Sequence, residues 1–414
     1  MNIDECRAQF PALNQKIEGI NPIFFDGPGG SHPSQAVLDA IVGYLSTSSA
    51  NLGGAYFSSR QTELTMHQAR EAAKDLYHAK DANEIVFGAN ATSLSFMVSR
   101  ALSKTWQKGD EIIVTALDHY CNVSPWVIEA EKLGVIVHQV RVNGLDCTLD
   151  FEHLNSLINQ KTRLFACTYA SNTVGSIVDV KAAIKLVKSK SNALSYIDAV
   201  HIAPHQPIDV QALDCDFLVS SAYKYFGPHL GVLFAKAQHL SSLHPDKVAP
   251  AKDINPNRWE TGTQNYEAMA GLSAVVNYIG SLSGEEGKSR RDKIEIAYQN
   301  IAQHESELSC LFLRKIKTYP QITLYGITDE DRLNERTPTF AFTIADVKPR
   351  AVSEFFGEHH VCIWDGHFYA QGVIEQLGLS ESGGVVRVGF MHYNTLDEIE
   401  KFFILLDELL EKYV

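Results

Sequence analysis

The sequence lacks the features of membrane-spanning and secreted proteins. Its 414 residues contain no run that approaches the ~18 consecutive apolar residues needed to cross a bilayer. The opening residues, MNIDECRAQFPALNQK, have neither a basic start nor an apolar secretory core. We therefore expect a cytoplasmic protein that does not bind membranes.

Positive charge is scarce as well. The chain has 36 Lys and Arg against 49 Asp and Glu, which gives a net charge of −13 at pH 7. Nucleic-acid backbones are bound by clustered Lys and Arg, so we expect no nucleic-acid partner. Apolar residues make up 45% of the chain and charged residues 21%, as in an ordinary globular protein. At ~150 residues per domain, the length predicts two or three domains.

Cysteine is sparse, and the histidines are not spaced as metal ligands. None of the seven cysteines forms a C-x-x-C pair, so neither a disulfide framework nor a Cys-based zinc site is predicted, and we expect mostly reduced core thiols. His201 and His205 are four residues apart, but Pro204 argues against a regular helix that would hold both on one face. Neither this pair nor the histidine cluster at 359–367 has a carboxylate at a recognisable ligand spacing, so we predict no metal site.

Complete nucleotide-binding signatures are also missing. The segment GPGGSH (27–32) fails G-x-G-x-x-G at its last position, and SLSGEEGKS (281–289) has Leu282 where a P-loop has its first glycine. We interpret both as turns. The glycines at 27–30 could still line a pocket, because glycine lets the backbone approach a ligand closely.

What the chain does have is an alternation of strand-like and helix-like segments over its first two-thirds. Nearly continuous apolar runs separated by helices indicate a mostly parallel sheet covered on both faces, and hence an α/β domain. The strand-like runs lie at 84–90, 111–118, 135–142, 162–170, 193–201, 217–225 and 231–237.

From about residue 265 the pattern becomes mainly helical. The charged, glycine-containing connector SGEEGKSRR (283–291) marks this change, which is typical of a domain boundary. We place a large α/β domain at residues 21–268 and a smaller α+β domain at residues 1–20 and 269–414. The smaller domain should contain helices at 266–282, 293–317 and 396–414 and strands at 322–326, 339–345 and 385–390.

Lys224 and Asp198 are the first candidates for chemistry. Lys224 follows the apolar run FLVSS and precedes a Gly-Pro turn. Burial lowers the pKa of a lysine, and a neutral amine can form a Schiff base with a carbonyl; a snorkelling structural lysine is the alternative. Asp198 ends the run YID one strand-helix-strand step upstream, where it could pair with a pyridinium N–H or cap a helix.

Two further segments could line one pocket together with Lys224 and Asp198. Residues 88–93, GANATS, follow a strand and open a helix, so backbone N–H groups and the Thr92 hydroxyl could hold a phosphate; a plain N-cap is the alternative. His119 also follows a strand, and its flat ring could stack on an aromatic cofactor. Each segment alone fits a structural role, but together with Lys224 and Asp198 they indicate a cofactor site.

Together these motifs resemble those of fold-type I pyridoxal 5'-phosphate (PLP) enzymes of the class V aminotransferase group, and the sequence is most similar to the SufS-like cysteine desulfurases. The resemblance runs from FFDGPGG (24–30) to VVRVGFMHYNT (385–395). It implies the fold of a PLP-dependent transferase, with a large domain built on a mostly parallel seven-stranded sheet and a smaller C-terminal α+β domain. It also implies PLP as the cofactor.

The resemblance implies roles for individual residues around that cofactor. Lys224, in an S-x-x-K-x-x-G-P segment, matches the lysine that forms the internal aldimine, and Asp198 matches the residue on the pyridine nitrogen. His201 stands near the ring hydroxyl, where the family commonly has Gln. His119 matches the histidine that stacks on the ring, and Asn172 would contact the ring oxygen.

The resemblance also implies a phosphate site and a homodimer. Ala91, Thr92, Ser221 and Tyr223 match phosphate-binding residues, although the family more often has His in place of Tyr223. Thr263 resembles a threonine that reaches the phosphate of the neighbouring subunit. A homodimer with active sites shared between subunits follows from that match.

Arg387 and Tyr369 concern the substrate. Arg387, in VVRVGF, matches the arginine that binds the substrate α-carboxylate, a task that suits a planar bidentate fork; a surface strand position is the alternative. The desulfurases carry their nucleophilic cysteine in a segment like T-G-H-H-C-A, and Tyr369 stands at that position in DGHFYA (365–370). Cys362 lies in a strand-like run that favours an inert buried thiol, and nothing indicates that Cys121 reaches substrate. We therefore expect no persulfide-forming activity.

These residues predict a PLP-dependent lyase or transferase acting on a small-molecule substrate, an amino acid, through an external aldimine, with Lys224 moving the Cα proton. We predict C–S or C–Se bond cleavage without a cysteine nucleophile. Transamination is one alternative, and a catalytically silent PLP-binding regulator or scaffold is another. The presence of Lys224 together with Arg387 argues against the silent protein, because a carrier needs no carboxylate clamp.

Overall fold

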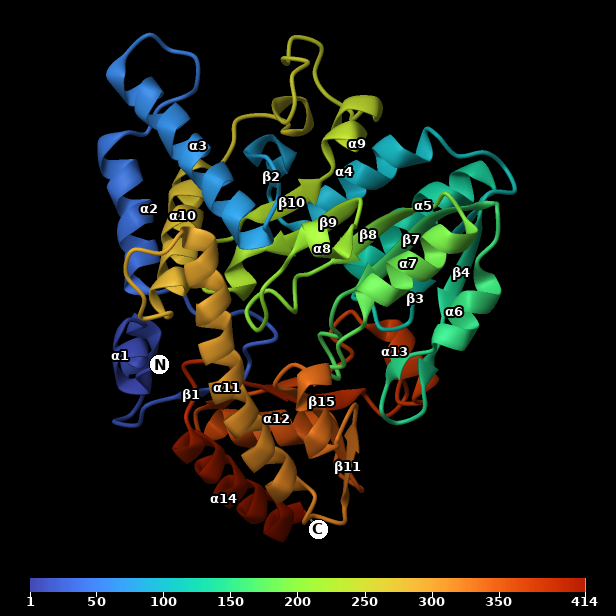
Figure 1. Cartoon of the computed structure of the whole chain (residues 1–414). Coiled ribbons are helices and arrows are strands. Elements are labelled where there is room, and N and C mark those ends of the chain that lie inside the picture. Colours follow the sequence, from blue (N-terminus) through green and yellow to red (C-terminus); the bar gives the residue numbers. More distant parts are fainter. Residues whose placement is uncertain (414) are drawn as a thin grey trace.

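A seven-stranded sheet forms the centre of the larger part of the molecule in the computed structural model, which describes residues 1–413 (Figure 1). Its strand order is β2-β10-β9-β8-β7-β3-β4, and only β10 runs antiparallel to its neighbours. This confirms the predicted mostly parallel sheet. The strands are β2 (Ile85–Gly88), β3 (Glu111–Thr115), β4 (Ile136–Val140), β7 (Thr162–Thr168), β8 (Leu194–Asp198), β9 (Phe217–Ser221) and β10 (Gly231–Ala235).

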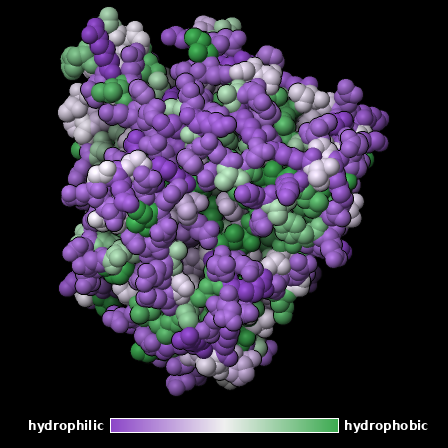
Figure 2. Space-filling view, viewed as in Figure 1, coloured by the Kyte–Doolittle hydropathy of each residue, from purple (hydrophilic) through white to green (hydrophobic). Residues whose placement is uncertain are grey.

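Helices cover both faces of this sheet, which is why its strands are apolar throughout. Successive side chains of a strand point to opposite faces. Ile113 thus packs in the core with α3 (Phe57–Tyr77), α7 (Val180–Lys190) and α10 (Tyr266–Ser281), whereas Ile112 and Val114 pack in the core with α4 (Ala91–Ser103) and α5 (Ser124–Leu133). On the face shown in Figure 2, hydrophilic residues dominate and apolar residues form small groups.

The smaller part of the molecule is an antiparallel sheet of order β11-β12-β15-β14, packed on long helices and drawn in orange and red in Figure 1. Its core is rich in phenylalanine, with Phe312, Phe340 and Phe402 fully buried. A smaller C-terminal α+β domain is thereby confirmed. Its elements are α11 (Arg290–Ile316), β11 (Ile322–Tyr325), β12 (Thr339–Ile344), α12 (Pro349–Glu358), β14 (Trp364–Gly366), β15 (Val385–Gly389) and α14 (Leu396–Tyr413).

The N-terminal segment joins the smaller sheet region. Strand β1 (Ile23–Phe24) pairs in parallel with β13 (Val361–Cys362), and Ile23 and Phe25 pack in the phenylalanine-rich core. The exact boundaries at residues 20 and 268 stay predictions. The remaining elements are α1 (Ile3–Ala8), α2 (Gln35–Thr47), β5 (Val142–Asn143), β6 (Thr148–Leu149), α6 (Phe151–Leu157), α8 (Val210–Leu213), α9 (Ala237–Ser242) and α13 (Gln371–Gln376). Within residues 1–413, every helix is too short or too polar to span a bilayer.

A buried ion pair fixes the segment that precedes α10. Arg70 of α3 donates from Nη2 to Oε2 of Glu260 at 2.6 Å, and only 7% and 3% of the two side chains is exposed. The other carboxylate oxygen of Glu260 accepts from the backbone N–H of Phe87 at 2.8 Å, and Arg70 also donates to the carbonyl of Ile85 at 2.6 Å. Glu260 therefore ties residues 261–265 to the edge strand β2.

Replacing Glu260 with Ala should lower the free energy of unfolding by ~3–5 kcal/mol, because it leaves Arg70 buried without a counter-ion. Chemical denaturation monitored by circular dichroism measures the change. The matched control is Asp246→Ala, which removes ion pairs with Arg100 and Lys104 whose side chains are about half exposed. Exposed pairs contribute ~1 kcal/mol or less, so an equal loss in both variants would contradict the role of Glu260.

Candidate active site

Several candidate residues lie where the parallel strands of the large sheet end. Open α/β sheets bind ligands outside the carboxyl ends of their strands, and a cavity of about 670 Å³ lies there. Asp198 ends β8, Lys224 follows β9 within one turn, and His119 and Asn172 follow β3 and β7. The cavity brings together the predicted residues Ala91, Thr92, His119, Asn172, Asp198, His201, Ser221, Tyr223 and Lys224.

The amine of Lys224 is held by backbone oxygens. Its Nζ donates to the carbonyls of Pro28 and Gly29, the latter at 2.9 Å, so the glycine-rich turn at 27–30 forms one wall of its surroundings. A Cβ atom on Gly29 would stand 3.0 Å from Nε1 of Trp364, so the turn can lie this close to Trp364 only because residue 29 has no side chain. Burial and the charge of Arg387 lower the pKa of Lys224 to about 7. A large share of this amine is therefore neutral at neutral pH.

Asp198 faces the cavity with one strong and one weak hydrogen-bond donor. Its Oδ1 accepts from the backbone N–H of Val200 at 2.8 Å, and its Oδ2 accepts from the thiol of Cys121 at 3.3 Å. Burial raises the pKa of Asp198, against the opposing effects of these donors and of Lys224. Burial and Asp198 together raise the pKa of the Cys121 thiol well above its ordinary value. Cys121 thus acts in this structure as a protonated donor to the carboxylate.

His119 is a neutral ring at one wall of the cavity. Its Nδ1 accepts from the backbone N–H of Cys121 at 3.0 Å, which leaves the ring proton on Nε2. Burial, with the charges of Lys224 and Arg387, lowers the pKa of His119 to about 4. The ring of Tyr369 lies next to it, with 5.3 Å between centroids.

His201 connects the cavity to the smaller sheet. It is 3% exposed, and its Nε2 lies 3.2 Å from the hydroxyl of Thr337 and 3.0 Å from that of Thr339, at the start of β12. Burial lowers the pKa of His201 well below its ordinary value. A neutral ring in this position can exchange hydrogen bonds with both hydroxyls without carrying charge into the protein interior.

The first turn of α4 is joined to the end of β9. The hydroxyl of Ser221 accepts from the backbone N–H of Ala91 at 3.0 Å. A Cβ atom on Gly231 would come within 2.6 Å of the backbone of Asn90, so β10 packs directly against the start of the helix. Thr92 lies in this turn, where the helix N-terminus favours a bound anion.

Arg387 of β15 borders the cavity without lining it. It is 4% exposed, and its Nη1 donates to the carbonyl of Asn172 at 2.8 Å. Burial lowers the pKa of Arg387 to about 9. Among residues 1–413, the buried Nε of Arg387 and the buried Oδ1 of Asn172 have no hydrogen-bond partner. Both are polar groups that a ligand could satisfy.

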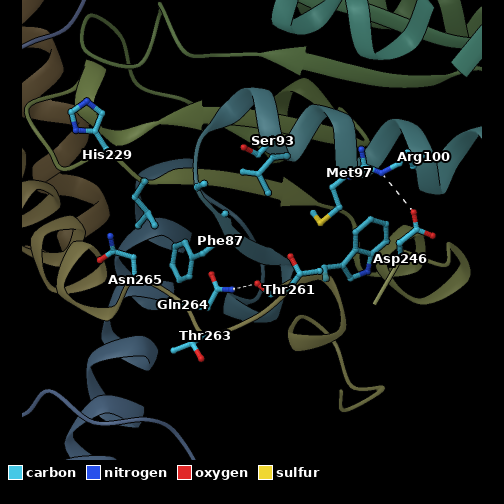
Figure 3. A pocket seen from close by; sticks show the side chains of 15 residues that line it. Phe87, Ser93, Met97, Arg100, His229, Asp246, Thr261, Thr263, Gln264 and Asn265 are labelled. Carbon is cyan, nitrogen blue, oxygen red and sulfur yellow. Dashed lines mark hydrogen bonds and ion pairs between the residues drawn. The ribbon is translucent and has the colours of Figure 1, made fainter. Parts of the chain in front are cut away.

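Thr263 lies apart from the other predicted residues. It lines a second cavity of about 420 Å³, between the start of α4 and residues 261–265 (Figure 3). In Figure 3, Thr263 lies beside Gln264 at one end, and the Arg100–Asp246 pair lies at the other. Its role toward a neighbouring subunit stays a prediction.

Two residues at the edge of the site were missed by the sequence analysis. Asp26 is half-buried in the turn before Pro28, and burial raises its pKa to about 6 against the charges of Arg387 and Lys224. The sequence feature that could have identified Asp26 is the one that identified Asp198, an acidic residue at the end of an apolar run. Phe368 packs its ring 4.0 Å from the guanidinium carbon of Arg387, and nothing in the local sequence indicates that contact.

Comparison with known proteins gives a consistent match along the chain. Residues 23–402 match the sequence model of the family described as aminotransferase class-V. The chain is 35% identical over 424 residues to the aminotransferase-like protein FGM3 of Gibberella zeae, covering 99% of this chain and 98% of that protein. It is 30% identical over 416 residues to a cysteine desulfurase of Pectobacterium atrosepticum, with 96% of each chain covered. The apo structure of a cysteine desulfurase from Thermococcus onnurineus NA1 superposes with a TM-score of 0.87 and 25% identity, covering 100% of this chain and 99% of the other.

In the protein without cofactor, Lys224 should react with amine-directed reagents with a midpoint near its pKa of about 7. An ordinary lysine has a pKa near ~10.4. Arg387→Leu should raise the midpoint, because it removes a neighbouring positive charge that disfavours the ammonium form. Asp198→Asn should lower it, because it removes a stabilising negative charge. Mass spectrometry of pH-dependent acetylation measures all three proteins, and a midpoint near 10 in the parent would contradict this electrostatic description.

Proposed function

This chain belongs to the class V aminotransferase family of PLP-dependent enzymes, and on that premise we propose that it is a lyase that cleaves a C–S or C–Se bond of an amino acid without a cysteine nucleophile. The observation that carries the proposal is the cavity that brings the Lys224 amine, whose pKa is lowered to about 7, together with Asp198 and the start of α4. The relatives named cysteine desulfurases favour a sulfur-containing substrate.

The residues of the large cavity fit PLP. Lys224 would hold the aldehyde carbon of PLP. Asp198 would hold its pyridine nitrogen, since the Oδ2 atom of Asp198 has only a weak thiol donor. The unpartnered Oδ1 of Asn172 is a free acceptor in the same cavity, and the neutral His119 offers a flat ring face. The phosphate would be held by the first turn of α4 and the neighbouring polar side chains, namely Ala91, Thr92, Ser221 and Tyr223, with His201 near the ring hydroxyl.

The protein's own groups then divide the chemical work. When bound, PLP would supply an aldehyde for the substrate amine and an acceptor for the electron pair left at Cα. Neutral Lys224 removes the Cα proton as a general base and can return it as an ammonium ion. The Asp198 carboxylate would hold a proton on the pyridine nitrogen of that group. Arg387 binds the α-carboxylate and so directs the Cα–H bond toward Lys224.

The thiols of the site support elimination over sulfur transfer to the protein. Tyr369 stands at the position of the desulfurase cysteine, the Cys121 thiol donates a hydrogen bond to Asp198, and burial raises the pKa of half-buried Cys362 to about 11. A thiolate nucleophile is therefore disfavoured here. In elimination, the Cα proton passes to Lys224 and the sulfur substituent leaves with its bonding electron pair. Water then converts the released enamine to a keto acid and ammonia.

We also propose a homodimer located in the cytoplasm. Thr263 lines a cavity that shares Ser93 and His229 with the cofactor cavity, which supports a contribution from a neighbouring subunit. Val42 of α2 and Phe57 of α3 are 62% and 80% exposed, and a partner subunit that covered them would remove their apolar surface from water. Free cysteines are typical of a reducing compartment.

Protein purified with PLP should be yellow, and borohydride should fix the cofactor mass to Lys224. Peptide mass spectrometry locates the modified lysine. Lys224→Ala should still bind PLP, because the other contacts remain, but should lose covalent fixation and ~10²–10⁴-fold of its turnover. Modification of a different lysine in the parent protein would refute the assignment.

Incubation with amino acids and S-substituted cysteines should release a thiol, ammonia and a keto acid, with no persulfide on the protein. The matched variant Tyr369→Cys restores a thiol at the desulfurase position and tests whether persulfide trapping works in this site. A persulfide on the parent would overturn the thiol-free mechanism. Keto acid without ammonia, with the cofactor in its amine form, would identify transamination, and no spectral response to any amino acid would favour the silent scaffold.

A further inference from the structure

The aromatic segment, residues 366–370, covers Arg387 from one side. The ring of Phe368 lies 4.0 Å from the guanidinium carbon, at the distance of a cation–π contact. Phe368 also accepts a hydrogen bond at its carbonyl from Nδ2 of Asn172, at 3.0 Å. Asn172 in turn accepts from Nη1 of Arg387, so the three residues form a closed set of contacts.

The backbone of the aromatic segment is strained, and hydrogen bonds from other parts of the site hold it in place. Phe368 and Tyr369 have φ angles of 51° and 58°, the left-handed region that bulky side chains rarely occupy. The backbone N–H of Tyr120 donates to the carbonyl of Tyr369 at 2.7 Å, and that of Ala370 donates to the carbonyl of His367 at 2.7 Å. Such strain persists where surrounding contacts impose it, and it concentrates at functional sites.

These contacts leave one edge of the Arg387 guanidinium free. Nη1 is used by Asn172, and one face is used by Phe368. Nε is buried and has no partner among residues 1–413, and Nη2 lies 3.6 Å from the point that a Cβ atom on Gly29 would occupy. Nε and Nη2 form the parallel pair of donors that matches a carboxylate. The missing side chain at Gly29 leaves space in front of Nη2.

We propose that Phe368 is a positioning residue, which stacks on the face of Arg387 and holds its Nε–Nη2 edge toward the substrate carboxylate. Binding of the substrate carboxylate then requires the aromatic segment to be packed against Arg387, although no atom of Phe368 contacts the reacting atoms. The proposal rests on the proposed function only in taking Arg387 as the carboxylate-binding group. It assigns a role to a ring where the resembling desulfurases have a histidine.

The first test compares Phe368→Leu, which keeps apolar bulk, with Phe368→Tyr, which keeps the ring face. Titrating each PLP-loaded protein with alanine and with ethylamine, followed by cofactor absorbance, gives apparent Kd values for ligands that differ by a carboxylate. Phe368→Leu should raise the apparent Kd for alanine about 10- to 30-fold and leave the Kd for ethylamine unchanged. Phe368→Tyr should bind alanine with the Kd of the parent. The matched control is Phe403→Leu on α14, which removes a ring that contacts the Lys315 amine at 5.5 Å, and it should behave as the parent.

The second test uses the cofactor-free protein, so it stands even if PLP fails to bind. Trp364 pairs with Arg387 in the β14–β15 register and is 51% exposed, whereas Trp106, Trp126 and Trp259 are at most 6% exposed. Acetate should therefore change Trp364 fluorescence on binding, with Trp364→Phe as the blank. Phe368→Leu should weaken acetate by the same factor as alanine.

Three results would overturn the proposal. These are unchanged alanine and acetate affinities in Phe368→Leu, an equal loss for alanine and ethylamine, and failure of Phe368→Tyr to restore binding. Circular dichroism checks that each variant folds, and Phe368→Met replaces the Leu variant if that one does not. Failure of the parent to bind PLP, with the acetate result intact, would refute the proposed function and leave the role of Phe368 standing.

Discussion

The placement of two cationic side chains in one poorly hydrated space governs the candidate site. Arg387 is almost fully buried and keeps its charge. Burial of Lys224 and repulsion from Arg387 therefore both disfavour the ammonium form of Lys224 and lower its pKa to about 7. Asp198 opposes that repulsion from the end of β8. The turn at 27–30 accepts hydrogen bonds from Lys224, and the backbone carbonyl of Asn172 accepts one from Arg387. The side chain of Asn172 holds the aromatic segment, whose Phe368 ring lies against Arg387.

Sheet geometry explains how residues far apart in sequence reach this space. Parallel strands end at one edge, so Asp198 and Lys224 arrive from the neighbouring strands β8 and β9, and Asn172 arrives from β7. This part could be predicted from sequence. Strands buried on both faces appear as apolar runs, and polar residues directly after such runs are rare enough to be noticed.

Contacts that depend on tertiary placement could not be predicted in this way. The thiol of Cys121 meets Asp198 across 77 positions of sequence, and the ring of Phe368 meets Arg387 through two left-handed residues that no local propensity favours. Strand β14 was also missed, because three residues with an exposed Trp364 and a glycine have no strand periodicity. Thr263 illustrates the opposite case, a motif residue that a single chain leaves outside the main cavity.

The position of the Lys224 amine when it is not joined to a cofactor has an evolutionary consequence. Its acceptors are main-chain oxygens of Pro28 and Gly29, and mutation cannot delete a main-chain oxygen. Substitution of neighbouring side chains therefore leaves the two hydrogen-bond acceptors of the Lys224 amine in place, while the side chains that line the cavity can change. A lineage carrying this turn can explore new substrates without first rebuilding its reactive group, provided that position 29 stays glycine.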